Sequence, residues 1–298
     1  MNKESKPIRV AFVNFWPGFN PEVFFIPVIH SATGMPVVVC RREEAELIIT
    51  SVFNWDRSKN HLQAIISPFR KLVLAAKKFS KTDNYLGFKL RKGQKLIWFT
   101  GENDRPPLID YDLSISFDDD DKVTQNVYFP LALMSLDWWG EKSYRHTPEY
   151  MRLGTVISPT EALASRSVAV EDRPKFACAF IGRPEPNRLR AIRSFEKLTG
   201  KQVDIFGKQG MATPLSKKEV ASEYRFMFCF ENDAYPGYVT EKPLEAWASG
   251  CIPIWDGIDK HGILNHNALI DRQQFEDISQ MIEFVEDLDS NLTRLAKI

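Results

Sequence analysis

A run of 30 residues near the carboxyl terminus gathers side chains suited to chemistry. It covers residues 228–257 and reads FCFENDAYPGYVTEKPLEAWASGCIPIWDG. The pattern predicts a strand, a polar loop, a helix capped by Thr240 and ended by Gly250, and a further strand. Lys242 in the first helical turn suits a diphosphate, because a helix amino terminus attracts anions. Glu241 beside it indicates another task, such as facing a positive charge that develops during a reaction. An ordinary helix with a mixed-charge first turn is the alternative.

Two further stretches carry candidate groups. Residues 179–192, AFIGRPEPNRLRAI, predict a strand, a loop and a helix whose first turn holds Arg188 and Arg190. The guanidinium fork matches phosphate oxygens. Residues 96–107, LIWFTGENDRPP, predict a strand that delivers Glu102 at its carboxyl end, where a carboxylate could act as a general base on a hydroxyl. The alternative for each arginine, taken singly, is a solvated surface residue. The alternative for Glu102 is a residue that caps a turn.

Other patterns point away from metal and dinucleotide chemistry. Asp118–Asp121 is similar to acidic clusters that hold Mg²⁺ or Mn²⁺. It lies in the other half of the chain from the two phosphate-binding loops, so a solvated turn is favoured. His261 and His266 are close in sequence, but no metal-ligand pattern surrounds them. The glycine fingerprints of dinucleotide dehydrogenases and P-loop NTPases are absent.

The elements that must position these groups are predicted strands and helices that alternate along the chain. Short apolar runs predict strands at 8–15, 37–40, 47–50, 96–100, 113–117, 176–181, 203–206, 224–230 and 251–255. Helical patterns cover 187–199, 216–223, 241–249 and 276–286. Strands that alternate with helices predict doubly wound parallel sheets, in which ligands bind beyond the carboxyl ends of the strands. This alternation of strands and helices is interrupted between about 150 and 170. We therefore expect two Rossmann-like domains, 1–155 and 156–298, facing across a cleft.

Composition excludes several classes of protein. The 298 residues carry 39 Lys+Arg and 39 Asp+Glu, and this balance argues against a nucleic-acid binder. A hydrophobic fraction of 44% excludes wholesale disorder. The chain contains neither a membrane-spanning apolar run nor the pattern of a signal peptide. Four cysteines without CxxC spacing predict buried free thiols in a reducing compartment, so we expect a cytoplasmic protein. They are Cys40, Cys178, Cys229 and Cys251.

Charge is segregated along the amino-terminal half. Residues 57–95 hold 11 Lys/Arg and one acid, whereas residues 102–121 hold eight acids and one base. Apolar residues recur at helical spacing within the basic stretch and predict a helix with a cationic face. Such a helix could lie on an anionic membrane surface. An amphipathic helix with a solvated basic face is the alternative.

Together, the three stretches resemble the GDP-fucose-dependent α-1,3/4-fucosyltransferases. The segment from Phe230 to Lys242 resembles the donor-site signature of that family nearly position by position. TGEN at 100–103 resembles its acceptor-side motif, and VDIFG at 203–207 is also similar to its members. Order and spacing agree over residues 8 to about 290. Arg183-Pro184 departs from the family, which usually has Ser-Asn in that loop.

The resemblance implies an α/β protein of the GT-B fold. The amino-terminal half would bind mainly the acceptor, and the carboxyl-terminal half would bind GDP-fucose. The reaction would be a direct displacement with inversion, from GDP-β-L-fucose to an α-L-fucoside. Glu102 would be the general base that deprotonates the acceptor hydroxyl. Glu241 would bind the fucose and face the oxocarbenium-like centre.

The resemblance also assigns the nucleotide contacts. Arg190 and Lys242 would hold the diphosphate and stabilise its leaving charge. Asn232 and Tyr238 would line the nucleotide-sugar pocket. A metal ion is not required by such a site, although Mn²⁺ or Mg²⁺ could stimulate it.

The resulting expectation is an α-1,3-fucosyltransferase that acts on an oligosaccharide or lipid-linked glycan, with O3 of N-acetylglucosamine as the expected hydroxyl. We expect it in bacterial cytoplasm, with residues 57–95 as a candidate peripheral contact on the inner face of the cytoplasmic membrane. Two alternatives stay open. One keeps the fold and mechanism with another GDP-sugar or acceptor, and the other is a catalytically inactive GDP-sugar-binding module.

Overall fold

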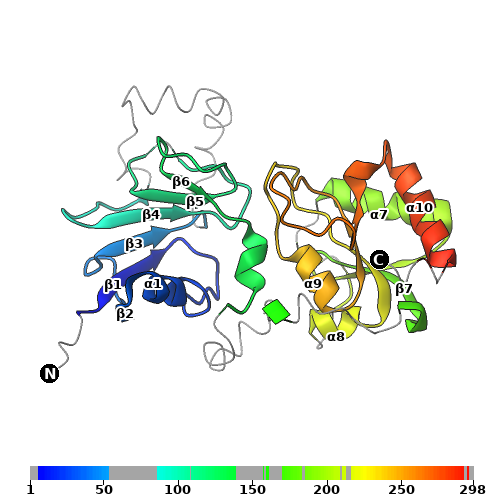
Figure 1. The fold of residues 1–298 in the computed structure, drawn as a ribbon, viewed down its shortest axis with the longest axis horizontal. Coiled ribbons are helices and arrows are strands. Elements are labelled where there is room, and N and C mark those ends of the chain that lie inside the picture. Colours follow the sequence, from blue (N-terminus) through cyan, green and yellow to red (C-terminus); the bar gives the residue numbers. More distant parts are fainter. Residues whose placement is uncertain are drawn as a thin grey trace. The chain divides into compact units, whose positions relative to one another are not determined.

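The computed structural model describes residues 6–53, 86–107, 109–138, 157, 159–160, 170–182, 185–208, 210–212, 216–291 and 294. The chain divides into two compact α/β units (Figure 1). The first unit contains the described residues up to Phe129, and those from Pro130 onward belong to the second. The predicted boundary at 155/156 falls outside the described residues and stays a prediction. The same is true of the basic helix expected in 57–95, most of which lies in the undescribed residues 54–85.

The first unit is built on a parallel sheet. Its strands have the order β2-β1-β3-β4-β5-β6, and every described pairing is parallel. Their bounds are Ile8–Val13 (β1), Val37–Val39 (β2), Leu47–Thr50 (β3), Lys95–Phe99 (β4), Leu113–Ser116 (β5) and Asn126–Tyr128 (β6). Helix α1, Phe25–Thr33, lies between β1 and β2 in the chain. Because β1 lies between β2 and β3, the strand order reverses direction at β1, and ligands bind at such a point in open sheets.

The second unit repeats this architecture with the strand order β11-β10-β9-β7-β8, again wholly parallel. The strands are Lys175–Phe180 (β7), Val203–Phe206 (β8), Tyr224–Phe228 (β9), Ile252–Trp255 (β10) and Ile270–Asp271 (β11). The helices are Pro186–Thr199 (α7), Lys217–Ala221 (α8), Lys242–Ala248 (α9) and Ile278–Ser290 (α10). The described residues of this unit also include the short 3₁₀ helices Leu131–Ser135, Val170–Asp172 and Arg272–Gln274.

Helices cover both faces of the second sheet. Successive residues of a strand point to opposite faces, and β7 shows this directly. Ala177 and Ala179 join the apolar cluster that includes residues of α7 and α10. Cys178, between them, joins the cluster that includes residues of α8 and α9. The expected doubly wound arrangement is therefore confirmed in this unit (Figure 1).

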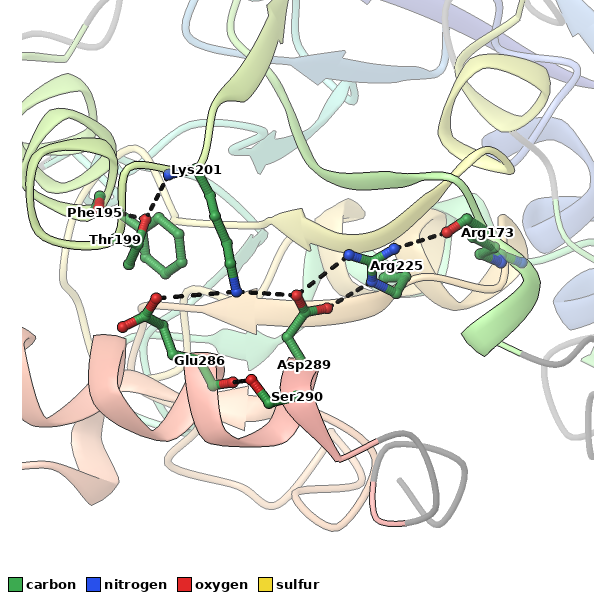
Figure 2. Close-up of polar contacts among 8 residues, drawn as sticks. All are labelled: Arg173, Phe195, Thr199, Lys201, Arg225, Glu286, Asp289 and Ser290. Carbon is green, nitrogen blue, oxygen red and sulfur yellow. Dashed lines mark hydrogen bonds and ion pairs between the residues drawn. The ribbon is translucent and has the colours of Figure 1, made fainter.

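An ion-pair network fastens the last helix to the second sheet. Figure 2 shows Asp289 of α10 between Lys201, which follows α7, and Arg225 of β9. The Asp289 carboxylate accepts from Arg225 Nε at 2.6 Å and from Lys201 Nζ at 3.0 Å. Arg225 also donates to the backbone oxygen of Arg173 at 2.7 Å. Only 8% of the Asp289 side chain is exposed, so this carboxylate depends on its two cationic partners.

The structure also contains elements that periodicity did not predict. These are α1, with the sequence FIPVIHSAT, and the edge strands β6 and β11, which have three and two residues. β6 (NVY) and β11 (ID) contain no run of apolar residues, unlike the short edge strand β2 (VVV), and Pro27 obscures the helical pattern of α1. Within the described part of the chain, no helix has the length and apolarity needed to span a bilayer.

The cysteines are free thiols, and three of them are buried. Cys178, Cys229 and Cys251 lie in the core of the second unit, as predicted. Cys40, which follows β2, is only partly buried. Burial raises the pKa of the Cys229 thiol well above its ordinary value, so this group stays neutral.

Candidate functional site

Polar and charged side chains gather where the strand order of the second sheet reverses. β7 lies between β8 and β9, so the carboxyl ends of β7 and β9 lie side by side at this point. Helix α9 begins beside them. We call the following residues the α9 cluster: Arg188, Lys217, Glu231, Asn232, Thr240, Glu241, Lys242 and Glu245.

Glu231 is the buried centre of the α9 cluster. Its side chain is fully buried, and its Oε2 accepts from Lys242 Nζ at 2.6 Å and from Thr240 Oγ1 at 2.7 Å. Its Oε1 accepts from the Thr240 backbone N–H at 2.9 Å and from Trp255 Nε1 at 3.3 Å. These contacts fix the carboxylate, which in turn holds the Lys242 ammonium at the start of α9.

The predicted cap of α9 is wrong. The residue in the N-cap position is Glu241, and no side chain caps the helix there. Thr240 is unavailable as a cap because its hydroxyl donates to Glu231 and accepts from Lys242 Nζ at 2.8 Å. The predicted end of the helix is close to that observed, since Ser249 is the C-cap and Gly250 follows with φ +74°.

Electrostatics keep Glu241 and Lys242 charged. Burial alone would raise the pKa of Glu241, but the Lys242 and Lys217 ammonium groups outweigh it and lower that pKa below its ordinary value. Burial alone would lower the pKa of Lys242, but the carboxylates of Glu231 and Glu241 raise it. A carboxylate and an ammonium group therefore stand next to each other, both ionised, at the start of α9.

A second ion pair lies next to this one. Lys217 in the first turn of α8 donates to both carboxylate oxygens of Glu245, at 3.0 and 2.9 Å. Burial raises the pKa of Glu245 despite this partner, since only 3% of its side chain is exposed. The pKa of Lys217 is raised against burial by the attraction of Glu245 and Glu241. Lys217 thus ties α8 to α9 and adds positive potential at Glu241.

The structure separates the two arginines of α7. Arg188 is buried, and its Nη1 donates to Asn232 Oδ1 at 2.9 Å. Burial lowers the pKa of Arg188 from its ordinary value, an effect that Glu231 opposes. Arg190 is exposed and borders a groove on the outer side of α7 together with Arg193 and Lys197. The arginine in the α9 cluster is therefore Arg188, whereas the sequence assigned diphosphate binding to Arg190.

Tyr238 lies inside the second unit. Its side chain is 1% exposed, and its backbone N–H donates to Tyr235 O at 3.0 Å. The preceding Gly237 donates to Ile258 O at 2.9 Å, which fixes the loop between β9 and α9 against the segment after β10. The loop that carries Asn232 and Tyr238 is thus anchored at both ends.

Glu102 lies in the first unit, just after β4, as predicted. The Thr100 hydroxyl donates to the Glu102 backbone oxygen, and the Asp104 N–H donates to the same oxygen at 2.6 Å. Arg105 steadies the turn by donating to Asn103 Oδ1 and Asp118 Oδ1, each at 2.6 Å. This tight turn leaves Glu102 partly exposed at the carboxyl edge of the sheet.

The acidic run 118–121 belongs to a turn. Asp118 pairs with Arg105, Asp120 Oδ1 accepts from the Tyr128 N–H at 2.7 Å, and Asp121 Oδ1 accepts from the Val123 N–H at 2.9 Å. Among the residues that the structure describes, His, Cys, Asp and Glu side chains form no group of three that could hold a metal ion.

Sequence reasoning gave no role to Glu231 or Glu245 and did not predict the contact of Arg188 with Asn232. The assignment of diphosphate binding to Arg190 stays a prediction. A signal for Arg188 was present, because Arg188, Ile192 and Phe195 follow helical spacing and the latter two are core residues. Glu231 comes directly after a strand and two buried residues, so it had to lie at the carboxyl edge. Glu245 gave no such signal, because its partner Lys217 is distant in sequence.

Comparisons with known proteins find similarity to one family of enzymes. Residues 170–297 match the family model for glycosyltransferase family 10 (fucosyltransferase), carboxyl-terminal part. An alpha-(1,3)-fucosyltransferase of Helicobacter pylori is 25% identical over 219 residues, which cover 66% of this chain and 45% of that protein. The human 4-galactosyl-N-acetylglucosaminide 3-alpha-L-fucosyltransferase is 30% identical over 118 residues, or 37% of this chain and 32% of that protein. This chain thus spans less than half the length of these curated relatives.

Solved structures share the fold. Crystal structures of alpha1,3-fucosyltransferase with GDP-fucose and without ligand have TM-scores of 0.62 and 0.63, with 18% and 19% sequence identity. Each similarity covers 99% of this chain and 82% of the other.

The two parallel-sheet units therefore define an α/β protein of the GT-B class, and the expected fold class is confirmed. Its carboxyl-terminal part, residues 170–297, matches the family 10 glycosyltransferases, the fucosyltransferases, which is the family that the motifs of the chain resemble.

Proposed function

We propose that this protein transfers L-fucose from GDP-β-L-fucose to a hydroxyl of an oligosaccharide or lipid-linked glycan, with inversion at the anomeric carbon. The expected hydroxyl is O3 of N-acetylglucosamine. The arrangement at the start of α9, where a buried Glu231 holds Lys242 beside the ionised Glu241, carries the proposal. It lies in the part of the chain that matches the fucosyltransferase family.

The α9 cluster suits a reaction in which charge separates. Lys242 and Arg188 would contact the diphosphate and stabilise the negative charge that builds on it as the bond to fucose breaks. Glu241 would face the sugar, whose anomeric carbon becomes positive in the same step. The low pKa of Glu241 supports this role, because the group stays an anion at neutral pH.

The proposal needs no metal ion for the diphosphate. Two cations of the cluster, Arg188 and Lys242, can exchange their present partners, Asn232 and Glu231, for phosphate oxygens. Charge-assisted hydrogen bonds of this kind are the strong ones in proteins. We therefore expect transfer in the presence of a chelator.

Glu102 would act as the general base on the acceptor hydroxyl. Its place after β4 at the carboxyl edge of the first sheet, and its partial exposure, support this role. The hydroxyl would lose its proton to Glu102 as its oxygen attacks the anomeric carbon and GDP leaves.

The test combines binding and transfer. Calorimetric titration with GDP-fucose and GDP-mannose, then product analysis with N-acetyllactosamine, identifies donor and linkage. In the Glu102→Gln variant, we expect transfer to fall by a factor on the order of 10² to 10⁴ while GDP affinity stays unchanged, because only the base is removed. Asp104→Asn, in the same turn, serves as the control.

The possible outcomes separate the alternatives. Binding of GDP-fucose together with an α-fucoside product supports the proposal. GDP binding without transfer to any glycan would favour the inactive binding module, and transfer from GDP-mannose would change the donor sugar. A Glu102→Gln variant that keeps most of its activity would remove Glu102 from the role of base.

A further inference from the structure

A group of aromatic rings lies at the carboxyl edge of the first sheet, where the strand order reverses between β1 and β3. Ligands of open α/β sheets bind at this kind of position. The chain that follows these two strands supplies Phe15, Trp16, Phe19 and Phe53. We call these four residues the edge aromatics.

The edge aromatics contact one another closely. Phe15 stacks on Phe19 with ring centroids 3.8 Å apart. Trp16 packs edge-to-face against Phe19 at 5.0 Å and against Phe53 at 5.6 Å. The buried Phe99 lies parallel to Phe15 at 6.0 Å and supports the group from the core. The edge aromatics themselves are partly exposed, unlike the ring of Phe99 beneath them.

A turn after β1 presents these rings. Asn14, which follows β1, has φ +59°, in the left-handed region that residues other than glycine rarely adopt. The Asn14 side chain donates to Thr50 Oγ1 at 3.3 Å, and its backbone oxygen accepts from the Phe53 N–H at 2.9 Å. These bonds join the ends of β1 and β3 and set the direction in which Phe15 and Trp16 leave the sheet.

Trp16 lies against the turn that carries the proposed base. A β-carbon built on Gly101 would lie 3.3 Å from Cζ3 of Trp16, so the indole packs directly on that backbone. Gly101 immediately precedes Glu102. The exposed rings and the carboxylate therefore border the same part of the carboxyl edge.

We propose that Trp16, supported by the other edge aromatics, binds a sugar ring of the acceptor through its apolar C–H face. The inference rests on the proposed function, since it takes Glu102 as the base for that acceptor. Rigid aromatic faces beside a few polar groups are typical of ligand sites, and they bind flat apolar surfaces with little loss of side-chain freedom. One face of a pyranose ring offers such a surface, while its hydroxyls stay free for Glu102.

The experiment measures acceptor and donor kinetics separately. In Trp16→Ala and Trp16→Leu, we expect the KM for N-acetyllactosamine to rise roughly tenfold, whereas the KM for GDP-fucose and the Kd for GDP stay unchanged. Trp16→Phe keeps an aromatic face and should restore most of the acceptor affinity. Phe88→Ala is the matched control, because this partly exposed ring contacts Arg42 in the segment before β3 and lies away from the carboxyl edge.

Trp16→Leu retains apolar volume, so it separates loss of the ring face from loss of folding, which urea unfolding reports. An unchanged acceptor KM in Trp16→Leu, in a protein that still transfers fucose, would overturn the inference and leave the proposed function intact. If the wild-type protein transfers no sugar, the proposed function fails. In that case, saturation-transfer NMR with N-acetyllactosamine tests whether the edge aromatics bind the sugar, independently of any transfer reaction. If the wild-type protein gives signals from sugar C–H protons and Trp16→Leu does not, the proposed sugar contact of Trp16 is supported. If the wild-type protein gives no signals, or if Trp16→Leu gives the same signals, the proposal is overturned.

Discussion

Arg188 and Arg190 are two residues apart in α7 but have different surroundings. Arg188 is buried beside Asn232, and Arg190 is exposed on the outer side of the helix. We expect Arg188→Ala to weaken GDP binding by about 1.5–3 kcal/mol, the range for a hydrogen bond to a charged group. Arg190→Ala should leave GDP affinity within a factor of about three. Calorimetric titration of both variants measures the difference, and a loss confined to Arg190→Ala would support the assignment of the diphosphate to Arg190 that the resemblance implies.

Glu241 makes the free energy of unfolding depend on pH, and its pKa determines the direction of that dependence. Its pKa in the folded protein is lower than its ordinary value of 4.5. The unfolded chain therefore binds the proton more readily, and the stabilisation is complete above pH 4.5 and lost as pH falls through the folded pKa. We expect Glu241→Gln to reduce the free energy of unfolding by about 1 kcal/mol at neutral pH. The difference between the variant and the wild type should shrink as pH falls through the folded pKa of Glu241.

Urea unfolding between neutral and acid pH measures this effect. Glu283→Gln is the control, since Glu283 is exposed on α10, away from the α9 cluster. A gap between wild type and Glu241→Gln that widens as pH falls would contradict the assigned sign.

At the scale of elements, α10 depends on the network of Asp289. Asp289→Asn removes the largely buried carboxylate that Arg225 and Lys201 share, so we expect the free energy of unfolding to fall by about 1–3 kcal/mol. Asp287→Asn is the matched control on the same helix, because Asp287 is 63% exposed and pairs with Arg294. Equal unfolding midpoints in urea for the two variants would show that the network contributes little.

Strands with a run of apolar residues were predictable, and strands without one were not. The strand run at 203–206 coincides with β8, and the helical pattern at 187–199 differs from α7 by one residue. These segments carry enough buried residues to impose a period. The two-residue β11 carries no period, and Thr240 had the right chemistry for a cap but formed stronger contacts with Glu231 and Lys242.

At the scale of the whole molecule, the sequence predicted which edge of each sheet holds the candidate groups. Parallel strands place their carboxyl ends together, so the positions of Glu102 and Lys242 followed from strand order alone. Contacts between residues far apart in sequence could not be predicted in this way. The pair of Lys217 with Glu245 and the contact of Trp16 with Gly101 each depend on how separate elements pack. Periodicity within one segment contains no information on such contacts.

If the α9 cluster binds the nucleotide as proposed, its charge balance affects the rate of binding. Its cations are Arg188, Lys217 and Lys242, and its carboxylates are Glu231, Glu241 and Glu245. Their formal charges cancel, so the cluster exerts little long-range pull on an approaching anion. Under the proposed function, encounter with the nucleotide would be governed by diffusion with weak dependence on ionic strength. Discrimination would begin only at contact, when Lys242 exchanges Glu231 for the incoming phosphate.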